Sequence, residues 1–190
     1  MSEPVSALNG LSSSGAVTVT ELGLRGMITL RGDLADTDVK NAATGVSGVD
    51  FPGQRAVHTN GDRGLAWMSP DELLVLVPHS EAEAATATIT DALAGQHALV
   101  VNVSDARAMF RLTGPGVREV IAKGAPVDMS PDVFQSGQIR RTRIGQLAAA
   151  FWINDDDSLD VICFRSVAGY LFDWLTMAAK DGSLPGFFRS

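Results

Sequence analysis

The sequence predicts an α+β fold that is built from two similar halves. The first observation is an internal repeat: Arg107–Gly114 (RAMFRLTG) matches Arg25–Gly32 (RGMITLRG) at half of its eight positions. The second is that each half runs strand, helix, strands, helix, which favours antiparallel sheets with helices packed on one side. The third is an apolar share of 45%, which is ordinary for a globular protein and too high for a disordered one.

The first half begins with a strongly alternating segment. Residues 17–31 are rich in Val, Thr, Leu and Ile, and with Gly23 as a break they predict two strands. A short helix is expected next, with Asp36 or Thr37 as its N-cap.

A hairpin, a strand and a helix complete the first half. The turn at Asn60-Gly61-Asp62 predicts a hairpin over residues 55–68. The apolar run Leu73–Val77 predicts a further strand. A capping box that Ser80 opens predicts a helix ending near Gly95.

The second half repeats this order. A strand is expected over Ala106–Leu112, and Pro115 suits the first turn of a helix that ends near Gly124. Residues 148–164 predict a second hairpin, and Ser166 is the expected cap of the last helix. We therefore expect residues 25–93 to superpose on residues 107–178.

Two details of the second half can be checked against a structure. In the alignment of the halves, Trp152 falls near Trp67 and Asp157 near Asp71. The last helix has an apolar stripe at i, i+3, i+4, i+7 spacing, which predicts one buried face. The residues of this stripe are Val167, Tyr170, Leu171, Trp174, Met177 and Ala178.

The predicted domain organisation has three parts. These are a flexible N-terminal arm over residues 1–15, one duplicated domain over 16–181 with halves of about 16–97 and 98–181, and a C-terminal tail over 182–190. Both ends carry apolar residues, namely Val5, Leu8, Leu11, Leu184, Phe187 and Phe188. We expect these residues to dock on partner chains; the alternatives are a disordered N-terminal tail, or ends that fold back on the domain.

Charge and cysteine content restrict the partners and the compartment. A formal net charge of −7 argues against binding to nucleic acid and to anionic lipid, because both need clustered Lys and Arg. The single cysteine, Cys163, cannot form an internal disulfide, which fits a reducing compartment. The sequence has no signal peptide pattern and no apolar run near the roughly 18 residues of a membrane span, so we expect a cytoplasmic protein.

No metal or nucleotide site is predicted. His58, His79 and His97 are far apart and lack the spacing of metal ligands. The acidic run Asp155–Asp157 lacks the pattern of a calcium loop and is interpreted as a hairpin tip. Gly114-Pro115-Gly116 opens a helix, but the last glycine of a dinucleotide fingerprint is replaced by Glu119.

No catalytic residue is predicted either. Cys163 lies in an apolar strand and is interpreted as a small buried hydrophobe. Asp105, Arg107 and Arg165 are the polar residues expected near sheet ends, and an Asp105–Arg107 ion pair could be structural or functional. Core packing is the preferred explanation of the three tryptophans over stacking on a flavin or pterin; they are Trp67, Trp152 and Trp174.

Four segments carry a family resemblance, through their order and spacing rather than through one specific motif. They are Trp67–Leu74 (WMSPDELL), Val101–Arg107 (VNVSDAR), Leu112–Gly124 (LTGPGVREVIAKG) with Pro126–Asp128 (PVD), and Phe164–Leu175 (FRSVAGYLFDWL). Together they resemble the gamma subunit of heterotetrameric sarcosine oxidase, from about Arg25 to Ala179. The resemblance implies a fold similar to the folate-binding domain of the glycine-cleavage aminomethyltransferase, which is itself duplicated.

The resemblance also implies a function and a set of partners. The complex demethylates sarcosine oxidatively to glycine, forms hydrogen peroxide and passes the one-carbon unit to tetrahydrofolate. FAD, FMN, NAD, tetrahydrofolate and zinc are then expected on the alpha, beta and delta subunits, with none in this chain. This chain would serve structure and assembly rather than catalysis. The alternatives are a stand-alone folate-binding protein related to the aminomethyltransferases, and a structural module of another oxidase.

Overall fold

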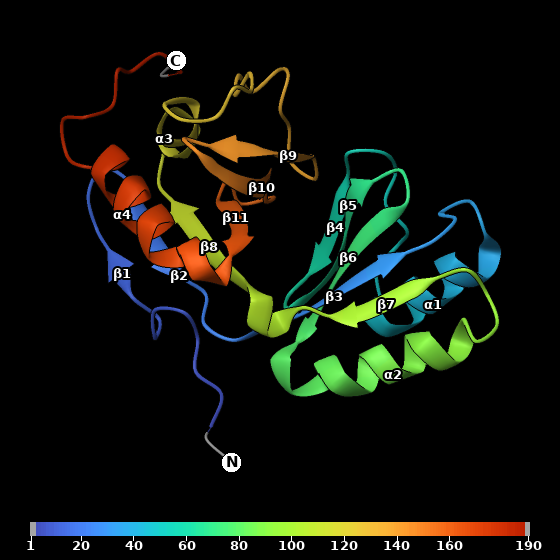
Figure 1. Ribbon diagram of the computed structural model, residues 1–190. Coiled ribbons are helices and arrows are strands. Elements are labelled where there is room, and N and C mark those ends of the chain that lie inside the picture. The colour runs from blue at the N-terminus through green and yellow to red at the C-terminus, as the bar shows by residue number, and fades with distance from the viewer. Residues whose placement is uncertain (1–2, 189–190) are drawn as a thin grey trace. The chain divides into compact units, whose positions relative to one another are not determined.

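The structure, a computed structural model, describes residues 3–188 and consists of two compact units (Figure 1). The central unit is Arg25–Asp105. The terminal unit combines the residues up to Leu24 with those from Ala106 onward, so it holds both ends of the chain. The chain therefore passes from one unit to the other twice, after Leu24 and after Asp105.

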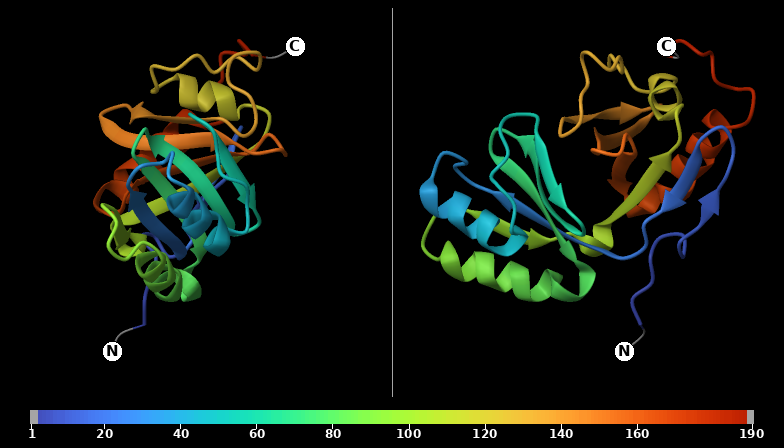
Figure 2. Two further views of the ribbon diagram at one scale, coloured as in Figure 1. Left: turned by 90° about the vertical axis from the view of Figure 1, so that its right-hand side faces the viewer. Right: turned by 180° about the vertical axis from the view of Figure 1, so that it is seen from behind.

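The central unit is an antiparallel sheet covered by two helices. In chain order its elements are β3 (Arg25–Arg31), α1 (Thr37–Ser47), β4 (Val57–Asn60), β5 (Arg63–Ser69), β6 (Glu72–Pro78), a 3-10 turn (His79–Glu81), α2 (Ala82–Ala92) and β7 (Leu99–Asn102). The strand order is β4-β5-β6-β3-β7. Figure 2 shows α1 and α2 on the same side of this sheet. Their apolar faces pack with the strands around Ile28, Leu73 and Ile89, which are fully buried.

The helix starts only partly follow the sequence prediction. Asp36 is the N-cap of α1, and its carboxylate accepts hydrogen bonds from the backbone N–H groups of Asp38 and Val39. Ser80 caps nothing, because it lies in the 3-10 turn before α2. Ser166 likewise lies in a 3-10 turn, Arg165–Val167, before the last helix. The prediction of serine caps is therefore wrong for both helices, which begin through a tighter turn.

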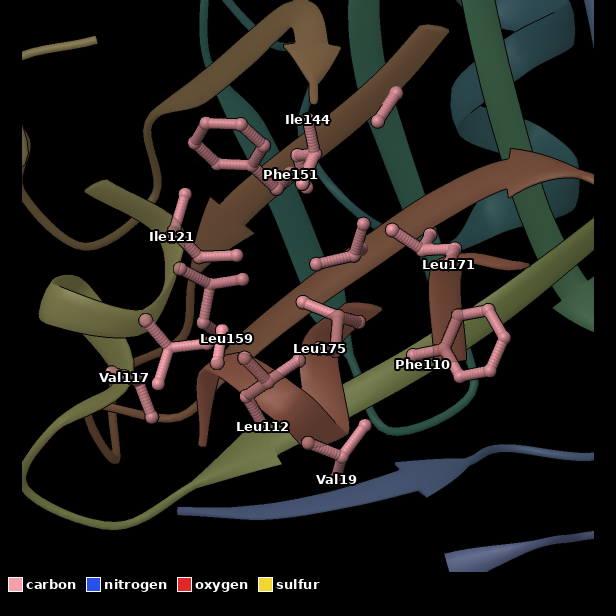
Figure 3. Close-up of a cluster of buried hydrophobic side chains, with 14 of the residues drawn as sticks. Val19, Phe110, Leu112, Val117, Ile121, Ile144, Phe151, Leu159, Leu171 and Leu175 are labelled. Atoms are coloured by element: carbon pink, nitrogen blue, oxygen red, sulfur yellow. The ribbon is translucent and has the colours of Figure 1, made fainter. Parts of the chain in front are cut away.

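The terminal unit has the same layers with a wider sheet. Its elements are β1 (Ser12–Ser13), β2 (Thr18–Glu21), β8 (Arg107–Thr113), α3 (Val117–Ala122), β9 (Ile139–Ile144), β10 (Leu147–Ile153), β11 (Leu159–Phe164) and α4 (Ala168–Ala178). The strand order is β1-β2-β8-β11-β10-β9, with antiparallel pairs throughout. Figure 3 shows side chains of α3, α4 and the sheet converging on one core, among them Val117, Leu171 and Phe110.

The internal repeat is confirmed by the order of strands. Four strands occupy matching places in the two sheets: β4-β5-β6-β3 in the central unit and β9-β10-β11-β8 in the terminal unit. The fifth strand of each sheet comes from an unexpected part of the chain. β2 precedes β3 in sequence but pairs with β8, whereas β7 precedes β8 but pairs with β3. Each sheet is thus completed by the strand that leads into the other repeat.

This exchange moves the boundaries between the halves. The sequence analysis places them at about 16–97 and 98–181. In the structure, β2 belongs to the terminal unit and β7 to the central unit. The reason is that hydrogen bonding between distant segments decides strand partners, whereas the sequence shows only which segments follow one another.

The expected equivalence of Trp67 and Trp152 is wrong by one residue. The rows across the matching strands are Leu30–Leu73–Trp67 in the central sheet and Leu112–Leu159–Ile153 in the terminal sheet. Trp67 therefore corresponds to Ile153. Because successive side chains of a strand point to opposite faces, Trp67 packs against the helix-covered core while Trp152 lies on the other face, 1% exposed.

The buried face of α4 also differs from the predicted stripe. Tyr170 and Met177 are 55% and 59% exposed. The buried residues of this helix are Ala168, Leu171, Phe172, Leu175 and Ala178. They form a second stripe at helical spacing, one residue further on. Since apolar residues cover more than half of the helix surface, periodicity fits both stripes, and packing against the sheet selects one of them.

Candidate interaction surface

Neither the histidines nor the acidic run forms a metal site. Among residues 3–188, no group of three or more His, Cys, Asp or Glu is placed to hold a metal ion. The Asp155–Asp157 run occupies the turn between β10 and β11, as predicted. There Asp156 accepts hydrogen bonds from the Ser158 hydroxyl and backbone N–H, which lower the pKa of Asp156. The run is thus the tip of a hairpin.

The glycines before α3 face an apolar side chain. A Cβ atom on Gly116 would clash with Leu184 Cδ1 and lie 3.2 Å from Val17 Cγ2. This glycine therefore makes room for the C-terminal tail. The space beside Gly116, at the start of α3, is filled by the Leu184 side chain. This agrees with the interpretation of Gly114-Pro115-Gly116 as a turn that leads into a helix.

Cys163 is buried in β11, as the sequence analysis expects. It is 2% exposed and belongs to the core of the terminal unit. Burial raises the pKa of the thiol to about 12. Because the thiolate is the reactive form, Cys163 is an inert core residue near neutral pH.

The three polar residues expected near sheet ends have separate surroundings. Asp105 lies in a 3-10 turn at the end of the central unit. The Arg107 guanidinium lies 5.4 Å from the centre of the Phe164 ring, a cation–π contact. Arg165 donates hydrogen bonds to the backbone carbonyls of Val5 and Ser6, at 2.8 and 3.2 Å. Arg165 therefore holds the N-terminal segment.

A buried carboxylate fixes the N-terminal segment. Glu21, 3% exposed, accepts hydrogen bonds from the Ser6 hydroxyl at 2.8 Å and the backbone N–H groups of Leu8 and Gly10 at 3.0 and 2.7 Å. Leu8 packs against the core of the terminal unit. The segment expected to be a flexible arm is therefore folded onto the terminal unit, because a buried carboxylate gains stability from these donors.

A second buried carboxylate fixes the C-terminal tail. Glu119, in α3, is 3% exposed and accepts hydrogen bonds from the backbone N–H groups of Gly186 and Phe188. Leu184 and Phe188 pack against the same core. The expectation that both ends simply dock on partners is thus incomplete: Leu8, Leu184 and Phe188 fold back on the domain.

The remaining apolar residues of both ends stay exposed. Val5, Leu11 and Phe187 are 60%, 47% and 79% exposed. Of nine large apolar side chains exposed among residues 3–188, seven lie in the terminal unit and two, Leu99 and Val101, in the central unit. Exposed apolar side chains mark a surface that binds other proteins where they form a contiguous patch. The terminal unit is therefore the candidate interaction surface.

Neither Glu21 nor Glu119 is predicted as a buried hydrogen-bond acceptor, although the sequence around Glu21 carries a signal. Val17, Val19 and Glu21 alternate along one face of a strand, and all three are buried. The alternation alone therefore places Glu21 on the core side. Glu119 had no such signal, because its burial depends on a tail more than sixty residues away in sequence.

Three comparisons with known proteins agree with this fold. A model of the sarcosine oxidase gamma subunit family matches residues 31–181. The sarcosine oxidase gamma subunit of Arthrobacter sp. is 24% identical over 176 residues, covering 92% of this chain and 85% of that protein. The gamma subunit of Corynebacterium sp. strain U-96 is 28% identical over 164 residues, covering 86% of this chain and 77% of that protein.

Solved structures are similar in fold. A chain of heterotetrameric sarcosine oxidase from Corynebacterium sp. U-96 matches with a TM-score of 0.79 and 23% identity, covering 88% of this chain and 87% of that chain. The glycine cleavage system aminomethyltransferase of Bartonella henselae matches with a TM-score of 0.62 and 13% identity, covering 85% of this chain and 46% of that protein. The predicted likeness to the aminomethyltransferase fold is thereby confirmed.

None of the helices within residues 3–188 has the length and apolar character that crossing a bilayer requires. The family model spans most of the chain and most of both repeats. This chain therefore belongs to the sarcosine oxidase gamma subunit family.

Proposed function

We propose that this chain is the gamma subunit of a heterotetrameric sarcosine oxidase, in which it serves assembly rather than catalysis. Family membership over residues 31–181 carries the proposal. The complete complex would convert sarcosine to glycine in the cytoplasm, with formation of hydrogen peroxide and methylene-tetrahydrofolate. Its other members would be the alpha, beta and delta subunits. FAD, FMN, NAD, tetrahydrofolate and zinc would bind to those subunits.

The chemistry of the described residues supports an assembly role. The one thiol is buried, with its pKa raised to about 12, and is unsuited to nucleophilic attack. Among the buried carboxylates, Glu21 and Glu119 accept hydrogen bonds from backbone N–H groups of the chain ends. By contrast, the terminal unit exposes apolar side chains that a partner chain could cover.

Co-expression with and without this chain tests the proposal. We expect the isolated chain to be colourless and the complex, recovered through a tag on this chain, to carry flavin absorbance. We also expect the other three subunits, expressed without this chain, to give little stable complex. A complex of those three that forms and turns over normally would refute the assembly role, and flavin bound to the isolated chain would refute the assignment of cofactors.

A stand-alone folate-binding protein is the second candidate. The fold shared with the aminomethyltransferase favours it, although at 13% identity that likeness concerns the fold alone. The two candidates differ in what the purified chain does by itself. Calorimetric titration with tetrahydrofolate should give no heat of binding if the chain is an assembly subunit, and saturable binding if it is a folate protein.

A further inference from the structure

Two neighbouring aromatic side chains of the C-terminal tail, Phe187 and Phe188, lie in different environments. Phe188 is half-buried and packs against the core of the terminal unit. Phe187 is 79% exposed, and its described ring contact is an edge-on approach to Phe188, with ring centres 5.0 Å apart. Phe187 is the most exposed large apolar side chain among residues 3–188.

The backbone on both sides of Phe187 is held by one carboxylate. Glu119 Oε2 accepts a hydrogen bond from the Gly186 N–H at 2.7 Å, and Oε1 accepts one from the Phe188 N–H at 3.3 Å. Because Glu119 is 3% exposed, it depends on these donors for the hydrogen bonds that it would otherwise make to water. The peptide groups flanking the exposed ring are thereby fixed in place.

The side chain of Phe187 is not needed for this arrangement. The tail is anchored by Leu184, which packs over Gly116, and by Phe188, which packs on the core. Gly186 adopts a left-handed backbone conformation with φ of 77°, which suits a glycine. The tail backbone beside Phe187 is thus held in place while the side chain of Phe187 stays exposed.

We propose that Phe187 is an interface anchor that inserts into an apolar pocket on another subunit of the sarcosine oxidase complex. This inference rests on the proposed function, which supplies the partner subunit. Aromatic side chains that fill pockets dominate the binding energy of many interfaces. Because the backbone beside Phe187 is already held in the free chain, binding has less of the chain to order. Glu119 then acts as a positioning residue for Phe187.

A second copy of this chain is a poorer occupant than a partner subunit. One phenylalanine contributes about 150–250 Å² of buried surface, far below the roughly 1,200 Å² of a stable interface. Two copies also repel each other, since each has a formal net charge of −7. The small area means that Phe187 must belong to a larger interface, and the repulsion between equal charges favours a different chain over a second copy.

The test compares substitutions of Phe187 within the four-subunit complex. The purified complex is diluted, and mass photometry measures the fraction that has lost this chain, which gives an apparent Kd. Phe187→Ser should raise this Kd at least about tenfold, the equivalent of ~1.4 kcal/mol. Phe187→Leu keeps an apolar side chain and should retain most of the affinity. The melting temperature of the isolated chain should be the same for both variants and the unaltered protein.

Glu119→Gln separates positioning from stability. Its amide can accept one of the two backbone hydrogen bonds but not both, so this variant should also raise the Kd. In the double variant with Phe187→Ser, the Kd should match that of Phe187→Ser alone, because Glu119 acts on the interface through Phe187. Additive effects of the two substitutions would overturn the positioning role.

Three other outcomes would overturn the proposal. A complex that assembles with an unchanged Kd for Phe187→Ser would refute the anchor and leave the proposed function intact. A dimer of the isolated chain that Phe187→Ser abolishes would assign the ring to a contact between copies. Failure of the unaltered chain to join the other subunits would refute the proposed function and the anchor together.

Discussion

The two units share one repeat but differ in what was added to it. The central unit has two helices of 11 residues each, α1 and α2, and its surface carries the ion pairs Arg25–Asp62, Arg31–Asp71 and Arg63–Glu81. In the terminal unit, α3 has only 6 residues; its Glu119 holds the C-terminal tail, and Glu21 of β2 holds the N-terminal segment. The terminal unit also exposes seven of the nine large apolar side chains exposed among residues 3–188.

The elements that the two units share differ from those that only the terminal unit has. The repeat itself supplies a four-stranded sheet and helices that bury one face, and it does so in both units. The apolar surface is concentrated in the unit that also gained β1, the N-terminal segment and the C-terminal tail. Val5, Leu11 and Phe187 belong to these additions, whereas Phe164, Tyr170 and Met177 lie in β11 and α4 of the repeat itself. The additions thus contribute part of the exposed apolar surface of this unit.

Among the changes considered, deletion of the C-terminal tail should cause the largest loss of stability in the terminal unit. Removing residues 184–190 strips Leu184 and Phe188 from the core and leaves the buried Glu119 without two hydrogen bonds. We expect the isolated chain to lose about 3–5 kcal/mol of stability, measured by urea unfolding. A hypothesis in which the whole tail serves only partners would predict an unchanged unfolding midpoint instead.

Substitution of aspartates in the two units should have an intermediate effect. Arg111 donates two hydrogen bonds to Asp160, at 2.7 and 2.8 Å, and Asp160 is 2% exposed. Asp160→Ala should therefore cost about 2 kcal/mol, reduced from the value of a fully buried pair because the Arg111 side chain is 40% exposed. Asp71→Ala in the central unit breaks an exposed pair with Arg31 and should change stability little. Equal losses in the two variants would contradict the distinction between a buried and an exposed pair.

Substitution of Cys163 should have the smallest effect. Cys163→Ala should cost on the order of 1 kcal/mol and leave the turnover of the assembled oxidase nearly intact, because it removes only a small buried group. Folding raises the pKa of this thiol from its ordinary value of 9.0 to about 12. The thiol therefore contributes stability that is fully present below pH 9 and is lost as the pH rises towards 12.

Measuring stability as a function of pH in the unaltered chain and in Cys163→Ala provides a control for this prediction. Other groups titrate between pH 9 and 12, but the variant lacks the contribution of the thiol. The stability of the unaltered chain should therefore fall more steeply with pH than that of Cys163→Ala. Identical pH curves, or loss of turnover without loss of folding, would show that Cys163 is accessible or has a chemical role.

Local patterns predicted most elements, and their failures have a common cause. Asp36 is the cap of α1 because capping depends on groups two or three residues away. The predicted stripe of α4 lies one residue before the buried stripe, since the helix contains two apolar stripes. Trp152 was matched to Trp67, but a shift of one residue in a strand exchanges the two faces of the sheet. In each failure, two arrangements satisfied the same local pattern.

The sequence by itself determined the duplication, the α+β class, the buried state of Cys163 and the family. The α+β class and the burial of Cys163 follow from short-range periodicity, which is a property of neighbouring residues. The duplication follows from the internal repeat, and the family from a resemblance in the order and spacing of four segments. Only the tertiary structure decided that β2 and β7 exchange places between the sheets, and that Glu21 and Glu119 hold the two chain ends. Those features join segments separated by up to about ninety residues. Strand edges and buried carboxylates accept any correctly placed donor, so the partner is selected by the fold and leaves no local trace in the sequence.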